Sequence, residues 1–187
     1  MKIKNIDFDV DIDVLDNHNI YELVVENPIT MTKIIYGLVR QIVDGQEGQF
    51  IITNKNKEIR YEKEVEIIID YFGFDINNKK IINKLYAKLG EIADEKIEEK
   101  SDINSKIIKV LDEVTTALGY TDVEYELDFK WADIFKVYGL EIMEEYSSLL
   151  EKMITYIKVL SNLTDTKLLI LINAKSYFEN QNIFEKI

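Results

Sequence analysis

The residues best suited to chemistry in this chain are lysines in a segment that lacks acidic side chains. From Ile76 to Gly90 there is no Asp or Glu, whereas Lys79, Lys80, Lys84 and Lys88 fall inside this window. On a helix, Lys80, Lys84 and Lys88 would share one stripe, because residues four apart lie on the same face. Like charges at this spacing weaken a free helix by about 0.2–0.5 kcal/mol per pair, and a neighbouring polyanion would make them favourable. The stripe therefore indicates either a nucleic-acid surface or an ordinary solvated lysine face.

A second candidate is a row of carboxylates, for which a bound cation is one explanation. If DVEYELDF is extended, one face carries Asp122, Glu124, Glu126 and Asp128. Neighbouring carboxylates would then stand about 6.6 Å apart and repel each other by roughly 0.6 kcal/mol in water. Calcium takes oxygen ligands at about 2.3–2.6 Å, so at most two of these side chains could share one ion. A solvated acidic face is the alternative, and we favour it for the similar alternating acids between Asp7 and Asp13.

Polar residues also close two apolar runs, in a way that is typical of nucleotide-hydrolysing folds. EIIID ends at Asp70 and LLILIN ends at Asn173, where such folds place a magnesium ligand and a phosphate sensor. The phosphate loop is missing, however, because VVENPITMTK offers no glycine and only Lys33 nearby. The single histidine, His18, and the absence of cysteine support neither a zinc site nor a nucleophilic triad. Retained nucleotide hydrolysis is therefore disfavoured.

The composition limits the class of protein. With 187 residues, 47% of them hydrophobic, the chain can form one domain or a domain with a sizeable insertion. It carries a net charge of −12, which argues against DNA binding unless basic side chains are segregated, gathered by several copies or bridged by a cation. No signal peptide or membrane-spanning run is recognisable, so we expect a soluble cytoplasmic protein without a membrane partner.

The hydrophobic periodicity predicts an α/β fold. Strands are expected at residues 7–14, 20–25, 49–53, 64–71 and 167–173, and helices at 28–43, 78–100, 104–118, 141–160 and 176–187. The first helix has a strong start at Asn27 and Pro28. Because a block of helices separates the last strand from the others, that strand must return to the sheet, which leaves the middle helices as an inserted projection.

Several stretches resemble one known family, the small ring-forming adaptation protein of type II-A CRISPR systems. The most specific is EIIIDYFGFDINNKKIINKLYAKL, and the others are LVVEN, EGQFIIT, DVEYELDFKWADIFKVYGLEI and LLILINAKSYF. The resemblance implies a degenerate phosphate-loop-ATPase-like α/β head domain with an inserted α-helical leg domain. It also implies a calcium-supported homotetrameric ring whose basic interior holds double-stranded DNA, often at its ends, during spacer acquisition.

Carried over by position, the resemblance assigns the head to residues 1–80 and 162–187 and the leg to residues 81–161. The implied DNA-binding residues are those of the basic turn and of the lysine stripe, namely Lys55, Lys57, Arg60, Lys80, Lys84 and Lys88. The implied calcium ligands are Asp122, Glu124, Glu126 and Asp128. The implied partners are the CRISPR integrase proteins and the effector nuclease, and no enzymatic activity is expected. Family members usually continue past LLILIN with another strand and helix, whereas this sequence ends soon after Tyr177.

Two other classes of protein stay open. One is a metal-dependent nuclease or residual ATPase that holds magnesium through Asp70. The other is a protein-interaction module whose acidic surface binds a basic partner. A clamp leaves DNA uncut in the presence of magnesium, whereas a nuclease does not, and a pure interaction module binds no DNA at any salt concentration.

Overall fold

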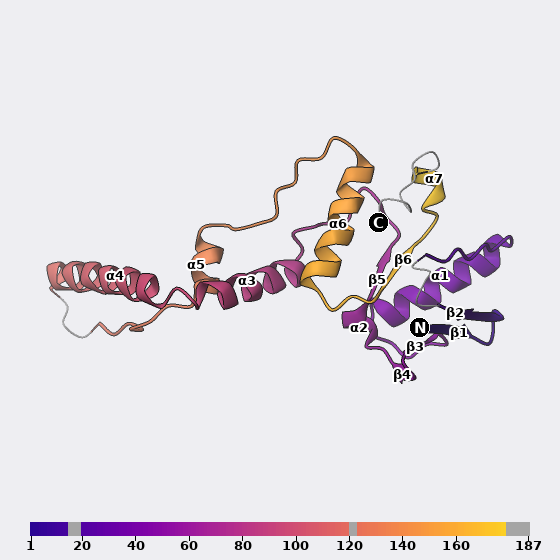
Figure 1. Ribbon diagram of the computed structural model, residues 1–187, viewed down its shortest axis with the longest axis horizontal. Helices are drawn as coiled ribbons and strands as arrows, with labels where there is room; N and C mark the ends of the chain where they lie inside the picture. The colour runs from indigo at the N-terminus through magenta and orange to yellow at the C-terminus, as the bar shows by residue number, and fades with distance from the viewer. Residues whose placement is uncertain (15–19, 120–122, 179–187) are drawn as a thin grey trace. The chain divides into compact units, whose positions relative to one another are not determined.

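The computed structural model describes residues 1–14, 20–119 and 123–178 and confirms a mixed α/β protein (Figure 1). The chain forms two compact units. Unit 1 consists of Met1–Asp75 and Glu145–Ile187, and unit 2 consists of Ile76–Glu144. The head and leg domains expected from the resemblance have boundaries at residues 80 and 162, and that division stays a prediction. No helix in the described ranges is long and apolar enough to cross a membrane.

Unit 1 contains a four-stranded antiparallel sheet in the order β2-β1-β3-β4. Its strands are β1 (Lys2–Asn5), β2 (Val10–Asp13), β3 (Ile51–Asn54) and β4 (Lys57–Glu58). β1 is the central strand that pairs with both β2 and β3, and its residue Ile3 lies opposite Ile12 on one side and Ile52 on the other. Ile52 is fully buried, so this register directs apolar side chains of the sheet into the core.

The strand expected at residues 7–14 starts only at Val10, because the residues before it form the turn of the β1–β2 hairpin. The buried Asn5 holds this turn, since its Oδ1 accepts hydrogen bonds from the backbone N–H groups of Asp7 (3.0 Å) and Phe8 (3.3 Å). On the strand itself, Asp11 pairs with Lys4 at 3.1 Å and Asp13 pairs with Lys2 at 3.2 Å across the ladder. These carboxylates form a surface of cross-strand ion pairs.

A second sheet in unit 1 joins distant parts of the sequence. β5 (Val65–Ile68) pairs in parallel with β6 (Leu168–Leu171), with Val65 opposite Leu168. Helix α1 (Pro28–Ile42) packs against this region, and the short helix α2 (Tyr61–Glu64) leads into β5. The shared core consists of Ile34, Leu38, Ile42, Phe50, Ile52, Ile59 and Val65. The last strand returns to unit 1 as expected, but it pairs with β5 in a separate two-stranded sheet and does not join the four-stranded one.

Helices α6 (Leu149–Leu163) and α7 (Lys175–Phe178) complete unit 1. α6 buries Met153, Tyr156 and Leu160, and the Tyr156 hydroxyl donates a hydrogen bond to Glu66 of β5 at 3.2 Å. The helix expected at residues 141–160 begins later than predicted, because Ser148 caps it by accepting a hydrogen bond from the Glu151 backbone N–H at 3.2 Å.

Two further expectations for unit 1 differ from the structure. The strand expected at residues 20–25 is wrong, since that segment has no β-ladder partner among the described residues and Val24 is exposed. The helix expected at residues 176–187 is described only as far as Phe178, and its remaining residues lie outside the described ranges, as does His18.

Unit 2 is helical and contains α3 (Lys79–Ala93), α4 (Ile97–Leu118) and α5 (Trp131–Val137). The single helix expected over residues 78–100 is interrupted, because Lys96 adopts a non-helical backbone (ψ 57°) before α4 begins. α3 packs against α5, where the Tyr86 and Phe135 rings lie 5.9 Å apart. The Tyr86 hydroxyl also donates a hydrogen bond to the Leu140 carbonyl at 3.0 Å, which fastens the segment after α5 to α3.

A buried carboxylate links three parts of unit 1. Glu64 Oε1 accepts a hydrogen bond from the Lys167 ammonium group, and its Oε2 accepts one from the Arg60 backbone N–H at 2.7 Å. The Glu64 carbonyl accepts from the Lys167 backbone N–H at 2.8 Å. The Lys167 hydrogen bond, followed by that of Arg60, lowers the pKa of Glu64 below its usual 4.5. Glu64 therefore holds α2 and β5 to the beginning of β6.

We expect Glu64→Gln to lower the stability of the protein and to flatten its pH dependence. Because the pKa of Glu64 is lower in the folded protein than in the unfolded chain, its contribution is complete above pH 4.5 and disappears as the pH falls through the folded-state pKa. Urea unfolding at several pH values between about 3 and 7 measures this. The exposed neighbour Glu62→Gln is the matched control, and equal pH profiles for the two variants would contradict the role of Glu64.

Candidate nucleic-acid interface

Helix α3 presents a basic surface beside the apolar face that anchors it. Asn78 caps the helix by accepting a hydrogen bond from the Ile81 backbone N–H at 3.1 Å. Ile81 is fully buried, and Leu85 and Leu89 are half-buried. Ile92 follows Leu85 and Leu89 at helical spacing but is 63% exposed, so the packed face ends before the last turn of the helix.

The three lysines of the stripe lie on this helix as the spacing predicted. Lys84 and Lys88 are exposed, and Lys80 is half-buried. The first turn of α3 contains no acidic residue and instead begins with Lys79 and Lys80. Positive charge near a helix N-terminus opposes the helix dipole, typically by about 0.3–1 kcal/mol. The electrostatic arrangement is therefore unfavourable for the helix alone and becomes favourable when an anion lies along it.

The second basic surface is the β3–β4 hairpin. Lys55 and Asn56 adopt positive φ angles of 49° and 62° between the paired residues Asn54 and Lys57, as a tight hairpin turn of the type I′ class requires. The turn exposes Lys55 and Lys57. This hairpin belongs to unit 1 and α3 belongs to unit 2, so the structure defines each basic surface by itself.

Arg60 is exposed beside the same hairpin, and its guanidinium is partly committed to the protein. Its Nε lies 3.8 Å from Glu64 Oε2, and the side chain is 64% exposed. A carboxylate at this distance reduces the positive potential available to a ligand. Among the residues of the hairpin surface, Lys55 and Lys57 are therefore better placed than Arg60 to contact phosphate.

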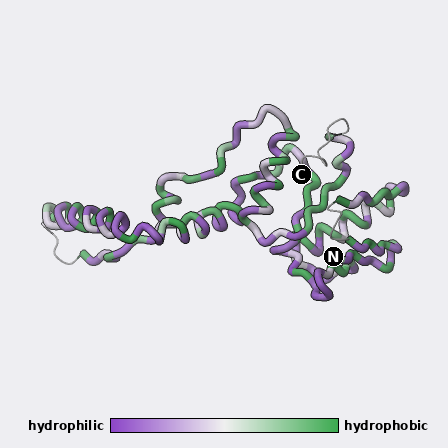
Figure 2. The backbone as a smooth tube through the Cα atoms, in the orientation of Figure 1, coloured by the Kyte–Doolittle hydropathy of each residue, from purple (hydrophilic) through white to green (hydrophobic). Residues whose placement is uncertain are grey.

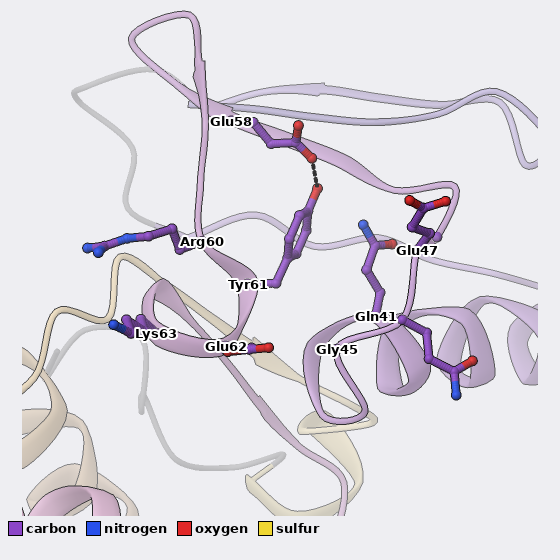
Figure 3. A pocket seen from close by; sticks show the side chains of 10 residues that line it. Gln41, Gly45, Glu47, Glu58, Arg60, Tyr61, Glu62 and Lys63 are labelled. Carbon is purple, nitrogen blue, oxygen red and sulfur yellow. Dashed lines mark hydrogen bonds between the residues drawn. The ribbon is translucent and has the colours of Figure 1, made fainter.

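A pocket of about 540 Å³ lies beside the hairpin, and Figure 3 shows its lining. The Tyr61 side chain extends towards Glu58, and its hydroxyl lies 3.2 Å from that carboxylate. The same hydroxyl donates to the Phe50 carbonyl at 2.7 Å, and burial raises the pKa of Tyr61. Glu47, Glu58 and Glu62 outnumber the two basic side chains of the lining. The pocket is thus unsuited to a phosphate, and the basic character belongs to the exposed turn.

The acidic row lies in the segment between α4 and α5. Asp122 falls outside the described residues, and the described remainder forms no strand, so the acids do not share a regular face there. Asp128 pairs with Lys100 at 3.0 Å, and a protein cation already neutralises it. Within residues 1–14, 20–119 and 123–178, no group of three or more Asp, Glu, His or Cys could hold a metal ion. The calcium role of the row stays a prediction.

The sequence gives no sign that one further carboxylate, Asp112, lies near this row. Asp112 of α4 lines the same hollow as Glu124 and accepts a hydrogen bond from the Tyr125 hydroxyl. That hydrogen bond raises the pKa of Tyr125. Asp112 lies ten or more residues from the acidic row, and only the return of the chain along α4 brings it close. No local signal could have revealed this pairing.

The positions expected in a nucleotide hydrolase carry structural contacts. Asp70 Oδ1 accepts hydrogen bonds from the backbone N–H groups of Phe72 (2.9 Å) and Gly73 (3.0 Å). At the start of α1, Asn27 Oδ1 accepts from the backbone N–H groups of Ile29 (2.9 Å) and Thr30 (3.1 Å). In a phosphate loop the amides at this position would face the nucleotide, whereas here a side chain of the protein occupies them.

Comparison with known proteins defines the class to which these features belong. The family model for CRISPR-associated proteins, Cas_Csn2, matches residues 42–187. The chain therefore belongs to the Csn2 family of CRISPR-associated proteins, and the resemblance noted from the sequence is confirmed.

Two relatives are similar over most of this chain. It is 24% identical over 147 residues to the CRISPR-associated protein Csn2 of Streptococcus agalactiae, with 76% of this chain and 64% of that protein covered. It is 24% identical over 145 residues to the CRISPR-associated protein Csn2 of Enterococcus faecalis, with 75% and 64% covered. The chain thus spans 64% of the length of the curated relatives it matches.

Proposed function

We propose that this protein is a non-enzymatic clamp on double-stranded DNA that assists spacer acquisition in a type II-A CRISPR system. The observation that carries the proposal is the acid-free helix α3, whose lysines Lys80, Lys84 and Lys88 form one stripe in a chain of net charge −12. Membership of the Csn2 family supports a role in CRISPR adaptation. The integrase proteins and the effector nuclease would then act beside it.

Local charge governs such binding more than net charge does. At physiological ionic strength the Debye length is about 8 Å, so exposed acidic side chains farther away than this are largely screened from a bound phosphate. Lys84 and Lys88 lie on an exposed surface with no carboxylate in their own helix before Glu91. A DNA backbone laid along α3 would meet positive charge although the whole chain is acidic.

The lysines would contact phosphates and not base edges. A lysine ammonium group is a flexible point charge, which suits a phosphate oxygen but does not read the pattern of donors and acceptors in a groove. Each neutralised phosphate contributes about −0.9 to the slope of log K against log salt concentration. Binding should accordingly be independent of sequence and weaken steeply with salt.

Assembly of several copies would strengthen the binding of DNA to these basic surfaces. One α3 stripe and one hairpin with Lys55, Lys57 and Arg60 provide few phosphate contacts. A homotetrameric ring, with an α/β head and a helical leg in each copy, would multiply these contacts around one duplex and favour entry at a free end. Calcium at Asp122, Glu124, Glu126 and Asp128 would reduce the carboxylate repulsion that opposes such assembly.

The structural contacts of Asp70 and the capped amides at the start of α1 support a clamp without hydrolytic activity. Asp70 uses an oxygen atom to hold the turn after β5, and Asn27 occupies the first amides of α1. A clamp therefore explains the basic surfaces without requiring a reaction centre.

We expect Lys80→Glu combined with Lys84→Glu to abolish retention on linear duplex DNA. The double change reverses two positive charges on the α3 stripe and places repulsive carboxylates against phosphate. An electrophoretic mobility shift with a linear duplex at fixed salt measures the loss, which we expect to exceed about a hundredfold.

The matched control is Lys136→Glu combined with Lys158→Glu, which makes the same charge change at exposed positions on α5 and α6. Circular dichroism should show both variants folded. The account would be contradicted if the two double variants lost affinity equally or if the α3 variant bound like the unaltered protein. Incubating the protein with plasmid DNA and magnesium tests the nuclease alternative. Cleaved plasmid would support a nuclease and contradict the clamp.

A second prediction concerns calcium. We expect a chelator, or Glu124→Gln combined with Glu126→Gln, to shift the protein towards smaller assemblies. The chelator removes the cation that the carboxylates would share, and the substitutions remove two of its ligands. Multi-angle light scattering with and without calcium measures the mass. Glu141→Gln combined with Glu145→Gln removes the same charge from an exposed segment and should leave the response to calcium intact. An assembly mass indifferent to calcium in the unaltered protein would remove the metal from the account.

A further inference from the structure

Helix α1 carries an exposed surface on the side opposite to its core-facing residues. Ile34 and Leu38 of this helix are buried. The residues exposed on the other side, here called the α1 surface, are Ile29, Lys33, Tyr36, Arg40 and Val43. Val43 is the C-cap residue and keeps helical backbone angles (φ −90°, ψ −46°), so it continues the same face. Figure 2 shows hydrophobic residues along α1 with hydrophilic ones between them.

The α1 surface consists of two parallel rows. Ile29, Tyr36 and Val43 follow one another at intervals of seven residues and form an apolar row. Lys33 and Arg40, which are also seven residues apart, form a basic row. The two rows lie side by side, because Tyr36 is three residues from Lys33 and four from Arg40. Successive members of each row are about 10.5 Å apart along the helix axis.

The basic row keeps its charge available to a ligand. α1 contains no Asp or Glu, and the nearest carboxylates in the sequence, Glu26 and Asp44, lie beyond the two ends of the helix. The Arg40 guanidinium lies 5.6 Å from the centroid of the Tyr36 ring, and its Nε donates a hydrogen bond to the Gln46 side chain at 2.7 Å. Both contacts are made with neutral groups, so they orient the guanidinium without cancelling its charge.

The apolar row distinguishes this surface from a simple basic patch. Ile29, Tyr36 and Val43 are 69%, 63% and 64% exposed. Single apolar side chains on a surface need no explanation, whereas large ones gathered in a row and bordered by charges mark an interaction site. DNA phosphates would satisfy the basic row and leave the apolar row uncovered. A protein surface with both carboxylates and apolar side chains satisfies the two rows together.

The repeat of the rows fits a helical partner. Side chains on one face of a helix recur every seven residues at about 10.5 Å, which matches the rows. On one face of an extended strand they recur about every 6.6 Å, which does not match. From Ile29 to Val43 the rows run for about 21 Å, the length of a helix of about 14 residues. A helix of this length with apolar residues and carboxylates at heptad spacing contacts both rows at once.

We propose that the α1 surface docks an acidic amphipathic helix of another protein. Apolar side chains of that helix pack against Ile29, Tyr36 and Val43, and its carboxylates pair with Lys33 and Arg40. Tyrosine and arginine are the residue types that most often dominate protein interfaces, so the Tyr36 and Arg40 pair forms the centre of the contact. This docking goes beyond the DNA clamp and does not depend on it.

A synthetic helix tests the docking. The probe is a fluorescein-labelled peptide of three heptads with leucine at the a and d positions and glutamate at the e and g positions, whose mutual repulsion opposes self-pairing. The matched control peptide has lysine in place of each glutamate. Fluorescence anisotropy with the full chain should show that the glutamate peptide binds at least about tenfold more tightly than the lysine peptide. Equal binding, tighter binding of the lysine peptide or no binding of either would overturn the proposal.

Substitutions on α1 locate the binding. Tyr36→Ala should weaken binding of the glutamate peptide about tenfold or more, and so should Lys33→Glu combined with Arg40→Glu. Tyr36→Phe keeps the ring and should bind like the unaltered protein. Lys136→Glu combined with Lys158→Glu makes the same charge change at exposed positions on α5 and α6 and is the control. Circular dichroism checks the fold, and the α1 double variant decides alone if Tyr36→Ala does not fold. Equal weakening in the two double variants would overturn the proposal.

Three measurements on Tyr36→Ala test other occupants of the surface. Retention on duplex DNA, the assembly mass by light scattering and binding to vesicles of phosphatidylcholine and phosphatidylglycerol should equal those of the unaltered protein. Lost DNA retention, a lower mass or vesicle binding that depends on Tyr36 would assign the surface to DNA, to a second copy or to a membrane, and each would overturn the proposal.

The outcome is separable from that of the proposed function. Specific peptide binding by a protein that retains no DNA would support the docking and remove the clamp. Retention of DNA by a protein that does not bind the glutamate peptide would overturn the docking and leave the clamp standing.

Discussion

The proposed function depends on one constraint, which is the separation of a group of positive side chains from the acidic residues that predominate in the rest of the chain. A chain of net charge −12 can approach a polyanion only where positive side chains are concentrated. Helix α3 concentrates them, because no residue from Ile76 to Gly90 is acidic and its apolar residues Ile81 and Leu85 anchor a neighbouring face. In the four-stranded sheet the charges alternate instead, and Asp11 and Asp13 pair with Lys4 and Lys2.

The rest of the fold supports this separation in two ways. The parallel pairing of β5 with β6 returns the chain to unit 1 after the whole of unit 2 has been formed, so the lysine-bearing helix belongs to an inserted unit. Glu64 reinforces that return, since its carboxylate holds Lys167 and the Arg60 backbone together. The chain belongs to the Csn2 family of CRISPR-associated proteins, and under the proposed function a sequence-independent grip on DNA would be a chemically simple task for exposed lysines.

The sequence predicts those parts of the fold that depend on local signals. Asn27 and Pro28 mark the start of α1 correctly, and the apolar runs ending at Asp70 and Asn173 contain β5 and β6. The sequence does not predict β1, because its alternating pattern is short and its stability comes from two neighbouring strands. The lysine stripe follows from helical spacing alone, whereas the proximity of Asp112 to Glu124 depends on a long-range return of the chain.

The salt dependence of duplex binding tests the central claim most directly. Affinity for a linear duplex would be measured between about 50 and 200 mM salt for the unaltered protein and for Lys84→Ala. We predict a steep loss of affinity with salt. When the Lys84 ammonium group is removed, the slope of log K against log salt concentration should become shallower by about 0.9 for each subunit that contacts phosphate through this lysine. Binding that is indifferent to salt, or a slope that Lys84→Ala leaves unchanged, would contradict the account.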